Sequence, residues 1–271
     1  MISEKTVNFS IGCLDDIIQI CNDSFAERKN IDTAQHSQGT LYLVSTPIGN
    51  LEDITLRALN ILKQVDFILA EDTRTASRLL HHFGISKKVV SYFSYNEERR
   101  IPYVIEELQA GKNIVLIAEA GTPLISDPGL KLVAAAIHQQ IMVVPIPGAS
   151  ALLAALVGAG IPTDRFIFEG FLPRKKGRTK ILEQLAAEQG TIILYESPYR
   201  VQKTVEDIVK IMGNRYIVIA RELTKKFEEF IRGYASDILT ALSERKLKGE
   251  VVILIAGMDF IIEQNKKNGP Q

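Results

Sequence analysis

Small and polar residues gather directly after several predicted strands, and their types fit acid–base chemistry and ligand binding. The segment Glu71-Asp72-Thr73-Arg74 offers two carboxylates and one guanidinium. A carboxylate here could accept a proton from a substrate hydroxyl, or Asp72 or Thr73 could simply cap the following helix. The segment Glu119–Gly129 crowds Gly121 and two prolines together, as a tight ligand-binding loop would. We interpret Glu119–Gly129 as a cofactor cradle that the rest of the chain supports.

The cradle follows a charge-free run, residues 114–118, that predicts a buried strand. Gly121 can take a positive φ without steric cost. Pro128 suits the first turn of a helix, and Ser126 or Asp127 would be its cap. In parallel sheets, ligand sites lie beyond the carboxyl ends of strands, where tight loops open into helices.

Two more loops follow predicted strands in the first half, at residues 46–50 and 145–150. Each is either a plain turn into a helix or a ligand contact, and Gly148 permits close approach to the backbone. Neither contains the glycine fingerprint of dinucleotide-binding proteins or of P-loop proteins. Standard nucleotide-binding classes are therefore not supported.

A basic run lies in the second half, with five Lys or Arg between residues 173 and 180. Such a run is either a solvated surface or a phosphate contact, and formal net charge is +0. Nucleic-acid binding would therefore depend on a local patch, which Arg74 and Arg78 could extend. The candidate RNA contacts are Arg78, Arg174, Lys175, Lys176 and Arg178.

Hydrophobic residues make up 46% of the 271 residues and charged residues 24%, which is typical of a globular protein. The two cysteines, Cys13 and Cys21, have no metal-ligand partners nearby, so we expect a reduced, cytoplasmic setting and no metal. No signal peptide is visible, and no apolar run is long enough to span a membrane.

Short apolar strands alternate with helical segments from residue 41 onward, which predicts an α/β fold. We expect residues 40–160 to form a domain with a mostly parallel sheet and residues 161–258 to form a domain with a mixed sheet. Residues 1–39 would be a loosely attached extension, and 259–271 a tail. The segment 149–160 is apolar nearly all round, so we expect a helix buried between layers or between subunits.

Long motifs in this order strengthen the functional interpretation: Thr46–Thr55, Ala70–Arg74, Ala120–Gly129, Pro145–Ala151, Glu169–Lys175, Tyr195–Pro198 and Arg221–Glu228. With them, the chain resembles the ribosomal RNA small subunit methyltransferase I family of the tetrapyrrole methylase superfamily, over residues 39–257. The resemblance implies a two-domain fold with its active site between the domains, and a homodimer. It also implies S-adenosylmethionine as methyl donor and 2′-O-methylation of a cytidine in the decoding region of 16S rRNA, free or in the 30S subunit.

Matching positions imply which residues contact the donor. The expected set is Ile48, Gly49, Glu119, Ala120, Gly121, Thr122, Pro123, Ile125, Ser150, Ala151, Tyr195 and Glu196. By analogy, Glu71 or Asp72 would take the ribose proton, and Arg74 would hold a phosphate through two hydrogen bonds.

The sequence also departs from the family pattern. Glu119 replaces a usual aspartate, and Phe93, Tyr95 and Tyr199 stand where histidines are common. An imidazole mechanism at those places is therefore not expected. Two alternatives remain open: a methyltransferase acting on a corrin or porphyrin precursor, and a non-catalytic RNA-binding factor of ribosome assembly.

Overall fold

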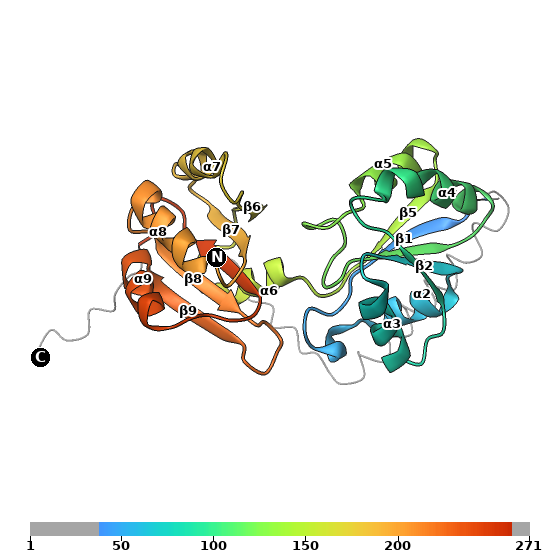
Figure 1. Ribbon diagram of the computed structural model, residues 1–271, viewed down its shortest axis with the longest axis horizontal. Helices are drawn as coiled ribbons and strands as arrows, with labels where there is room; N and C mark the ends of the chain where they lie inside the picture. The colour runs from blue at the N-terminus through green and yellow to red at the C-terminus, as the bar shows by residue number, and fades with distance from the viewer. Residues whose placement is uncertain (1–37, 262–271) are drawn as a thin grey trace, which may run out of the picture.

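The computed structural model describes residues 38–261 and contains two five-stranded sheets, each with its own helices (Figure 1). The predicted extension lies almost wholly outside the described residues, as does the tail beyond residue 261. None of the helices within 38–261 has the length and apolar character needed to cross a bilayer.

The first sheet is entirely parallel, in the order β3-β2-β4-β1-β5. Its strands are apolar and short, and β2 and β4 are buried along their whole length, as expected for strands covered on both faces. The strand bounds are β1 (Thr40–Val44), β2 (Phe67–Ala70), β3 (Lys88–Ser91), β4 (Ile114–Ile117) and β5 (Met142–Ile146).

Helices cover both faces of this sheet because alternate side chains of a strand point to opposite faces. On one face, Val44 and Ile68 pack with Leu62 and Leu80 of the first two α-helices. On the other face, Leu41 and Leu69 pack with the next two helices. The helix bounds are η1 (Leu51–Asp53), α2 (Leu56–Gln64), α3 (Thr73–His82), α4 (Glu97–Gln109) and α5 (Leu130–His138).

The second sheet is mixed, in the order β6-β7-β10-β8-β9, with only the β6–β7 pair parallel. Three helices cover one face and α6 covers the other. The bounds are α6 (Ala151–Ala159), β6 (Phe166–Phe171), α7 (Arg178–Leu185), β7 (Thr191–Glu196), α8 (Val201–Met212), β8 (Tyr216–Arg221), β9 (Glu229–Tyr234), α9 (Ala235–Glu244) and β10 (Val251–Ile255). The predicted α/β fold with one parallel and one mixed sheet is therefore confirmed.

Helix α6 lies between the two sheets in Figure 1 and packs on the second one. Leu152 and Leu156 are buried there, whereas Leu153 and Val157 are 51% and 76% exposed. The helix is therefore buried along one side only in this chain, although its sequence is apolar nearly all round. A domain boundary at residue 160 stays a prediction.

The predicted cap of α5 was wrong. Neither Ser126 nor Asp127 caps this helix, which begins after Gly129, a residue with φ 135° and no capping side chain. The N–H of Gly129 instead donates to Oε1 of Glu97, 3.2 Å away, and that oxygen also accepts from the Tyr92 hydroxyl at 2.8 Å. A buried carboxylate from α4 thus does the capping, which leaves the Asp127 side chain for another role.

Candidate functional site

The site lies at the ends of neighbouring strands β1 and β4, where the chain leaves the two strands toward opposite faces of the sheet. Helix α2 follows β1 on one face, and α5 follows β4 on the other. Such a switch point opens a crevice at the carboxyl ends of the strands. Across it, the N–H of Thr46 donates to the carbonyl of Gly121 at 2.9 Å, and the N–H of Gly121 to that of Thr46 at 3.0 Å.

A cleft of about 670 Å³ occupies this crevice, and both halves of the chain supply its walls. The first half supplies the loops after β1, β4 and β5. The second half supplies the end of β7, with Tyr195 and Glu196, and the apolar side chains Leu223 and Val252. This volume and mixed lining are typical of a small-molecule site.

The structure brings nearly all the expected donor contacts together. Of the predicted set, only Pro123 is absent from the lining of this cleft. Side-chain hydrogen bonds fix the loops: Oγ of Ser45 and Oγ1 of Thr122 lie 3.0 Å apart, and Thr122 also donates to the carbonyl of Ala149 at 3.2 Å. Three strand-end loops are thereby tied into one surface.

Gly121 is the residue that keeps the cleft open. Its φ is +83°, as the sequence predicts for a tight loop. A Cβ at this position would lie 3.3 Å from Cγ2 of Ile48 and 3.8 Å from the carbonyl oxygen of Ala149. A side chain would therefore fill the space between two loops that line the cleft.

Asp127 is a candidate that the sequence pattern indicated only as a helix cap. It lines the cleft, and burial together with the nearby charges of Glu71 and Glu119 raises its pKa to about 6. The pKa of Glu71 is also raised, by burial first and then by Glu119. Three carboxylates thus gather at the ends of β2 and β4. The sequence feature that could have marked Asp127 as a candidate is its position as an acidic residue inside a loop that follows a strand.

Asp72 and Arg74 have a structural arrangement of their own. The Asp72 side chain caps α3 by accepting from the N–H of Arg74 at 2.8 Å, and Nη2 of Arg74 pairs with its other oxygen at 3.0 Å. These hydrogen bonds lower the pKa of Asp72 to about 2. Neither residue lines the cleft, and the Arg74 side chain is 87% exposed. The alternative of a helix cap is confirmed.

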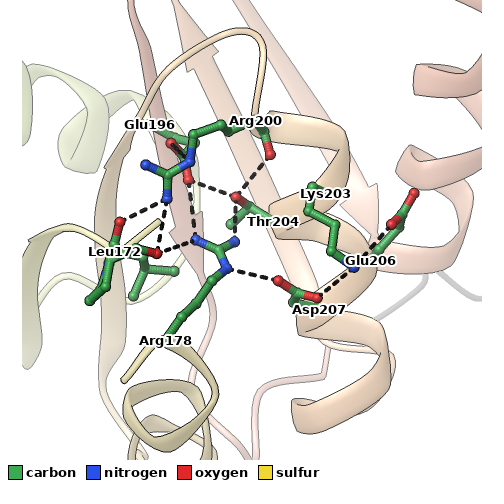
Figure 2. Close-up of polar contacts among 9 residues, drawn as sticks. Leu172, Arg178, Glu196, Arg200, Lys203, Thr204, Glu206 and Asp207 are labelled. Carbon is green, nitrogen blue, oxygen red and sulfur yellow. Dashed lines mark hydrogen bonds and ion pairs between the residues drawn. The ribbon is translucent and has the colours of Figure 1, made fainter. Parts of the chain in front are cut away.

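Glu196 belongs to a buried network at the end of β7 (Figure 2). Its Oε1 accepts from the N–H of Ser197 at 2.8 Å and pairs with Arg200 at 3.3 Å. Its Oε2 accepts from Thr204 at 2.6 Å and pairs with Arg178 at 3.8 Å. Both carboxylate oxygens are engaged, so Glu196 shapes the wall of the cleft through the backbone that it holds.

Arg178 departs from the rest of the basic run. It is only 8% exposed, and it donates to Asp207 at 2.8 Å and to Thr204 at 2.8 Å, as Figure 2 shows. A buried guanidinium with these partners does not fit the expected RNA contact. Arg174, Lys175 and Lys176, in the loop before α7, are all exposed.

Tyr195 fastens the start of α6 to the second sheet at the edge of the cleft. Its hydroxyl accepts a hydrogen bond from the N–H of Leu152, in the first turn of α6, at 3.2 Å. Its ring packs edge-on against Phe168 and Phe171, with centroids 4.8 and 5.7 Å away. Among residues 38–261, no group of three or more His, Cys, Asp or Glu side chains could hold a metal ion.

Comparison with known proteins shows the family to which this chain belongs. Residues 40–239 match the family model described as Tetrapyrrole (Corrin/Porphyrin) Methylases. A protein of Halalkalibacterium halodurans named ribosomal RNA small subunit methyltransferase I is 49% identical over 221 residues, covering 81% of this chain and 76% of that protein. The chain belongs to the ribosomal RNA small subunit methyltransferase I family, within the tetrapyrrole methylases. The resemblance inferred from the sequence motifs is therefore confirmed.

Solved structures of proteins with low sequence identity share the fold. A diphthine synthase superposes with a TM-score of 0.64 at 16% identity, covering 80% of this chain and 90% of that one. Uroporphyrin-III C-methyl transferase from Thermus thermophilus, complexed with S-adenyl homocysteine, gives 0.59 at 18% identity, covering 81% and 98%. At these identities the likeness concerns the fold alone.

Proposed function

We propose that this protein transfers a methyl group from S-adenosylmethionine to the 2′-hydroxyl of a cytidine ribose in the decoding region of 16S rRNA. Its membership in a family whose curated members are named rRNA small subunit methyltransferases supports rRNA as the acceptor. The donor, the ribose position, a cytoplasmic location and a homodimer come from the resemblance in the motifs. The cleft at the switch point is the single feature on which the proposal depends.

The residues of the cleft fit a donor of this kind. Gly121 leaves a space between loops that any side chain would fill, and the cleft is large enough for a molecule of that size. S-adenosylmethionine, when bound, supplies a methyl group activated by a positively charged sulfur. Asp127 and Glu119 line this part of the cleft, and Glu71 lies near them outside the lining, so their carboxylates favour a cation here.

Asp127 is the residue we assign to the ribose proton. A ribose hydroxyl is a very weak acid, so a base must take its proton as the new bond forms. With a pKa of about 6, the Asp127 carboxylate is ionised at neutral pH yet more basic than an ordinary aspartate. Asp72 is a weaker base because its pKa is about 2 and its oxygens are held by Arg74.

RNA would be held by one arginine that lines the donor cleft and by a basic loop outside it. Arg78 lies at the rim of the cleft and is exposed, and the loop before α7 presents Arg174, Lys175 and Lys176. Contacts between such side chains and phosphates position an RNA strand without reading its sequence. A tetrapyrrole acceptor, the alternative that the shared fold keeps open, also carries carboxylates that this basic loop would attract, so the choice of acceptor rests on an assay of methyl transfer.

One assay tests the proposal against both alternatives. Purified protein is incubated with labelled S-adenosylmethionine and, separately, with unmodified small subunits, naked rRNA and uroporphyrinogen, and incorporated label is mapped. Label on a ribose 2′-oxygen of small-subunit rRNA is the expected result. Label on the tetrapyrrole alone, or RNA binding with no transfer to any acceptor, would overturn it.

A further inference from the structure

A second hollow, of about 290 Å³, opens beside the donor cleft on the side of α3. It shares Pro47, Thr75, Arg78 and Glu119 with the cleft, so the two spaces adjoin. The shared residues form the border, and the inner part of the hollow belongs to the first half of the chain alone. A ligand in the cleft and a second one in the hollow would therefore meet at this border.

Thr46 gives the hollow an unusual polar group. Tyr42 and Val44 of β1 face α2 and α3, so Thr46, two residues further on, faces the same way. Thr46 lines the hollow and is 2% exposed, and its hydroxyl oxygen has no hydrogen-bond partner within residues 38–261. A buried hydroxyl without a partner is unfavourable, and ligand-binding sites are places where such a group is retained.

The rest of the lining suits one flat aromatic ring with polar edges. Ala76, Leu79 and Ile117 supply apolar walls, while Arg78 and Glu119 lie at the border with the cleft. An enzyme that modifies one nucleotide commonly turns it out of its strand and holds the base between apolar side chains, with hydrogen bonds to the base edge. The hollow offers this combination directly beside the place assigned to the methyl donor.

We propose that this hollow receives the base of the nucleotide whose ribose is methylated, a single pyrimidine turned out of its RNA strand. The inference rests on the proposed function. With the base in the hollow and the donor in the cleft, the ribose lies at their shared border. Arg78, which donates from Nη2 to Thr75 Oγ1 at 3.1 Å and is exposed, then meets a flanking phosphate with its remaining N–H groups.

The lining also favours cytosine over uracil. A carboxylate accepts from the exocyclic amino group of cytosine, which Glu119 can do at the border. The Thr46 hydroxyl can donate to a ring acceptor of the same base. Uracil presents a carbonyl oxygen where cytosine has its amino group, and that oxygen would face the Glu119 carboxylate.

Two variants and one control test the inference. Thr46→Val removes the hydroxyl and keeps the shape, and Leu79→Trp fills the hollow. Leu56→Trp is the matched control, because Leu56 is 80% exposed and lies outside both spaces. For each protein, donor affinity is measured by calorimetry, stability by thermal unfolding, and kcat/KM by methyl transfer to unmodified small subunits at saturating donor.

The expected results distinguish a base pocket from a packing gap and from an extension of the donor cleft. Thr46→Val should keep donor affinity and raise thermal stability slightly, because an unpaired buried hydroxyl is removed, yet lose about fivefold in kcat/KM for small subunits, the size of one hydrogen bond. Leu79→Trp should keep donor affinity and lose roughly tenfold or more, because an overfilled pocket excludes the base. Leu56→Trp should match the wild type in all three measurements.

Four outcomes would overturn the inference. If Thr46→Val stabilises the protein and transfers methyl like the wild type, the hollow is a packing gap. If Leu79→Trp weakens donor binding, the hollow belongs to the donor. If wild-type protein methylates no small-subunit RNA, the proposed function is wrong, and the inference that rests on it is wrong too. If the wild type and both hollow variants transfer methyl normally, only the inference is wrong. Thr46→Val decides the matter should Leu79→Trp misfold.

Discussion

The backbones of Thr46 and Gly121 exchange two hydrogen bonds, at 2.9 and 3.0 Å, although the two residues are distant in sequence and belong to no regular strand. This bridge joins the loop after β1 to the loop after β4 beside the cleft, which Gly121 lines. Because Gly121 has φ +83° there, the joint depends on a residue without a side chain. Its replacement should therefore affect the ligand more than the fold.

Replacing Gly121 by alanine should weaken donor binding at least tenfold. The new Cβ would lie 3.3 Å from Ile48 Cγ2, inside the cleft, and the left-handed backbone adds a stability loss of about 1–2 kcal/mol. Gly84→Ala is the matched control, since Gly84 has φ +63° with nothing within 4 Å of its added Cβ. Calorimetry should show a comparable loss of stability in both variants and a loss of donor affinity only at Gly121.

Asp127→Asn should lower the single-turnover rate of methyl transfer by a factor of about 10²–10⁴, the range for loss of a general base. Donor binding should remain measurable. Asp72→Asn is the comparison, because asparagine caps a helix as well as aspartate and the Asp72 carboxylate lies outside the cleft. Equal losses in the two variants would contradict the assignment of Asp127.

The pKa of about 6 at Asp127 predicts how donor affinity varies with pH. Below this pKa the carboxyl is neutral, so the cationic donor loses a neighbouring negative charge. Affinity for S-adenosylmethionine should fall roughly fivefold between pH 7.5 and pH 5. Affinity for the demethylated product, whose sulfur is uncharged, should change less. Calorimetry at both pH values checks this, with Asp127→Asn as the reference in which the change of affinity with pH should be smaller.

The same carboxyl predicts a stability change in the donor-free protein. Its pKa in the folded state, about 6, lies above the ordinary aspartate value of 3.8, so folding favours the protonated form. The stabilisation is complete below about pH 3.8 and is lost as the pH rises through 6. Between pH 7 and pH 5, wild-type protein should therefore gain stability relative to Asp127→Asn in paired denaturant titrations.

Two arginines four residues apart should behave in opposite ways. Arg178→Ala should cost roughly 3 kcal/mol of stability, because Glu196 and Asp207 would keep buried charges with fewer partners. Arg174→Ala should change stability by less than about 0.5 kcal/mol. Urea unfolding of both variants checks the difference, and a small loss at Arg178 would show that Arg200 alone supports Glu196.

Replacing Arg174, Lys175 and Lys176 together by alanine should weaken RNA binding uniformly. Each phosphate contact removed should reduce the slope of log K against log salt by about 0.7 to 0.9. Donor affinity should not change, because none of the three lines the cleft. Binding titrations at several salt concentrations check this, and an unaltered slope would leave these side chains as solvated surface.

Local sequence pattern predicted most of the fold because the strands and helices are strongly periodic. Residues 166–171, 201–212 and 229–234 form the predicted elements with the predicted bounds. The loops after the strands, predicted to form the site, line one cleft because parallel strands place them at one edge of the sheet. The two-sided burial of β2 and β4 follows from their uninterrupted apolar residues.

Partners distant in sequence account for the errors. Asp127 was interpreted as a cap because its neighbours look like a helix start, while the actual cap, Glu97, lies on another helix. Arg178 looked like one more cation of a basic run, and its burial depends on Asp207 and Thr204 of α8. Local pattern carries no information about such contacts, so charge and capping roles had to come from the structure.

The passage from the first sheet to the second is a stretch of four residues, 147–150, between β5 and α6. Helix α6 itself is fastened to the second sheet at both ends, by Tyr195 at Leu152 and by Arg232 at the carbonyl of Ala159, 3.0 Å away. Rocking of one half against the other would therefore bend this short hinge. Ser150 of the hinge also lines the donor cleft, so a bound ligand would act as a wedge that sets the angle between the halves.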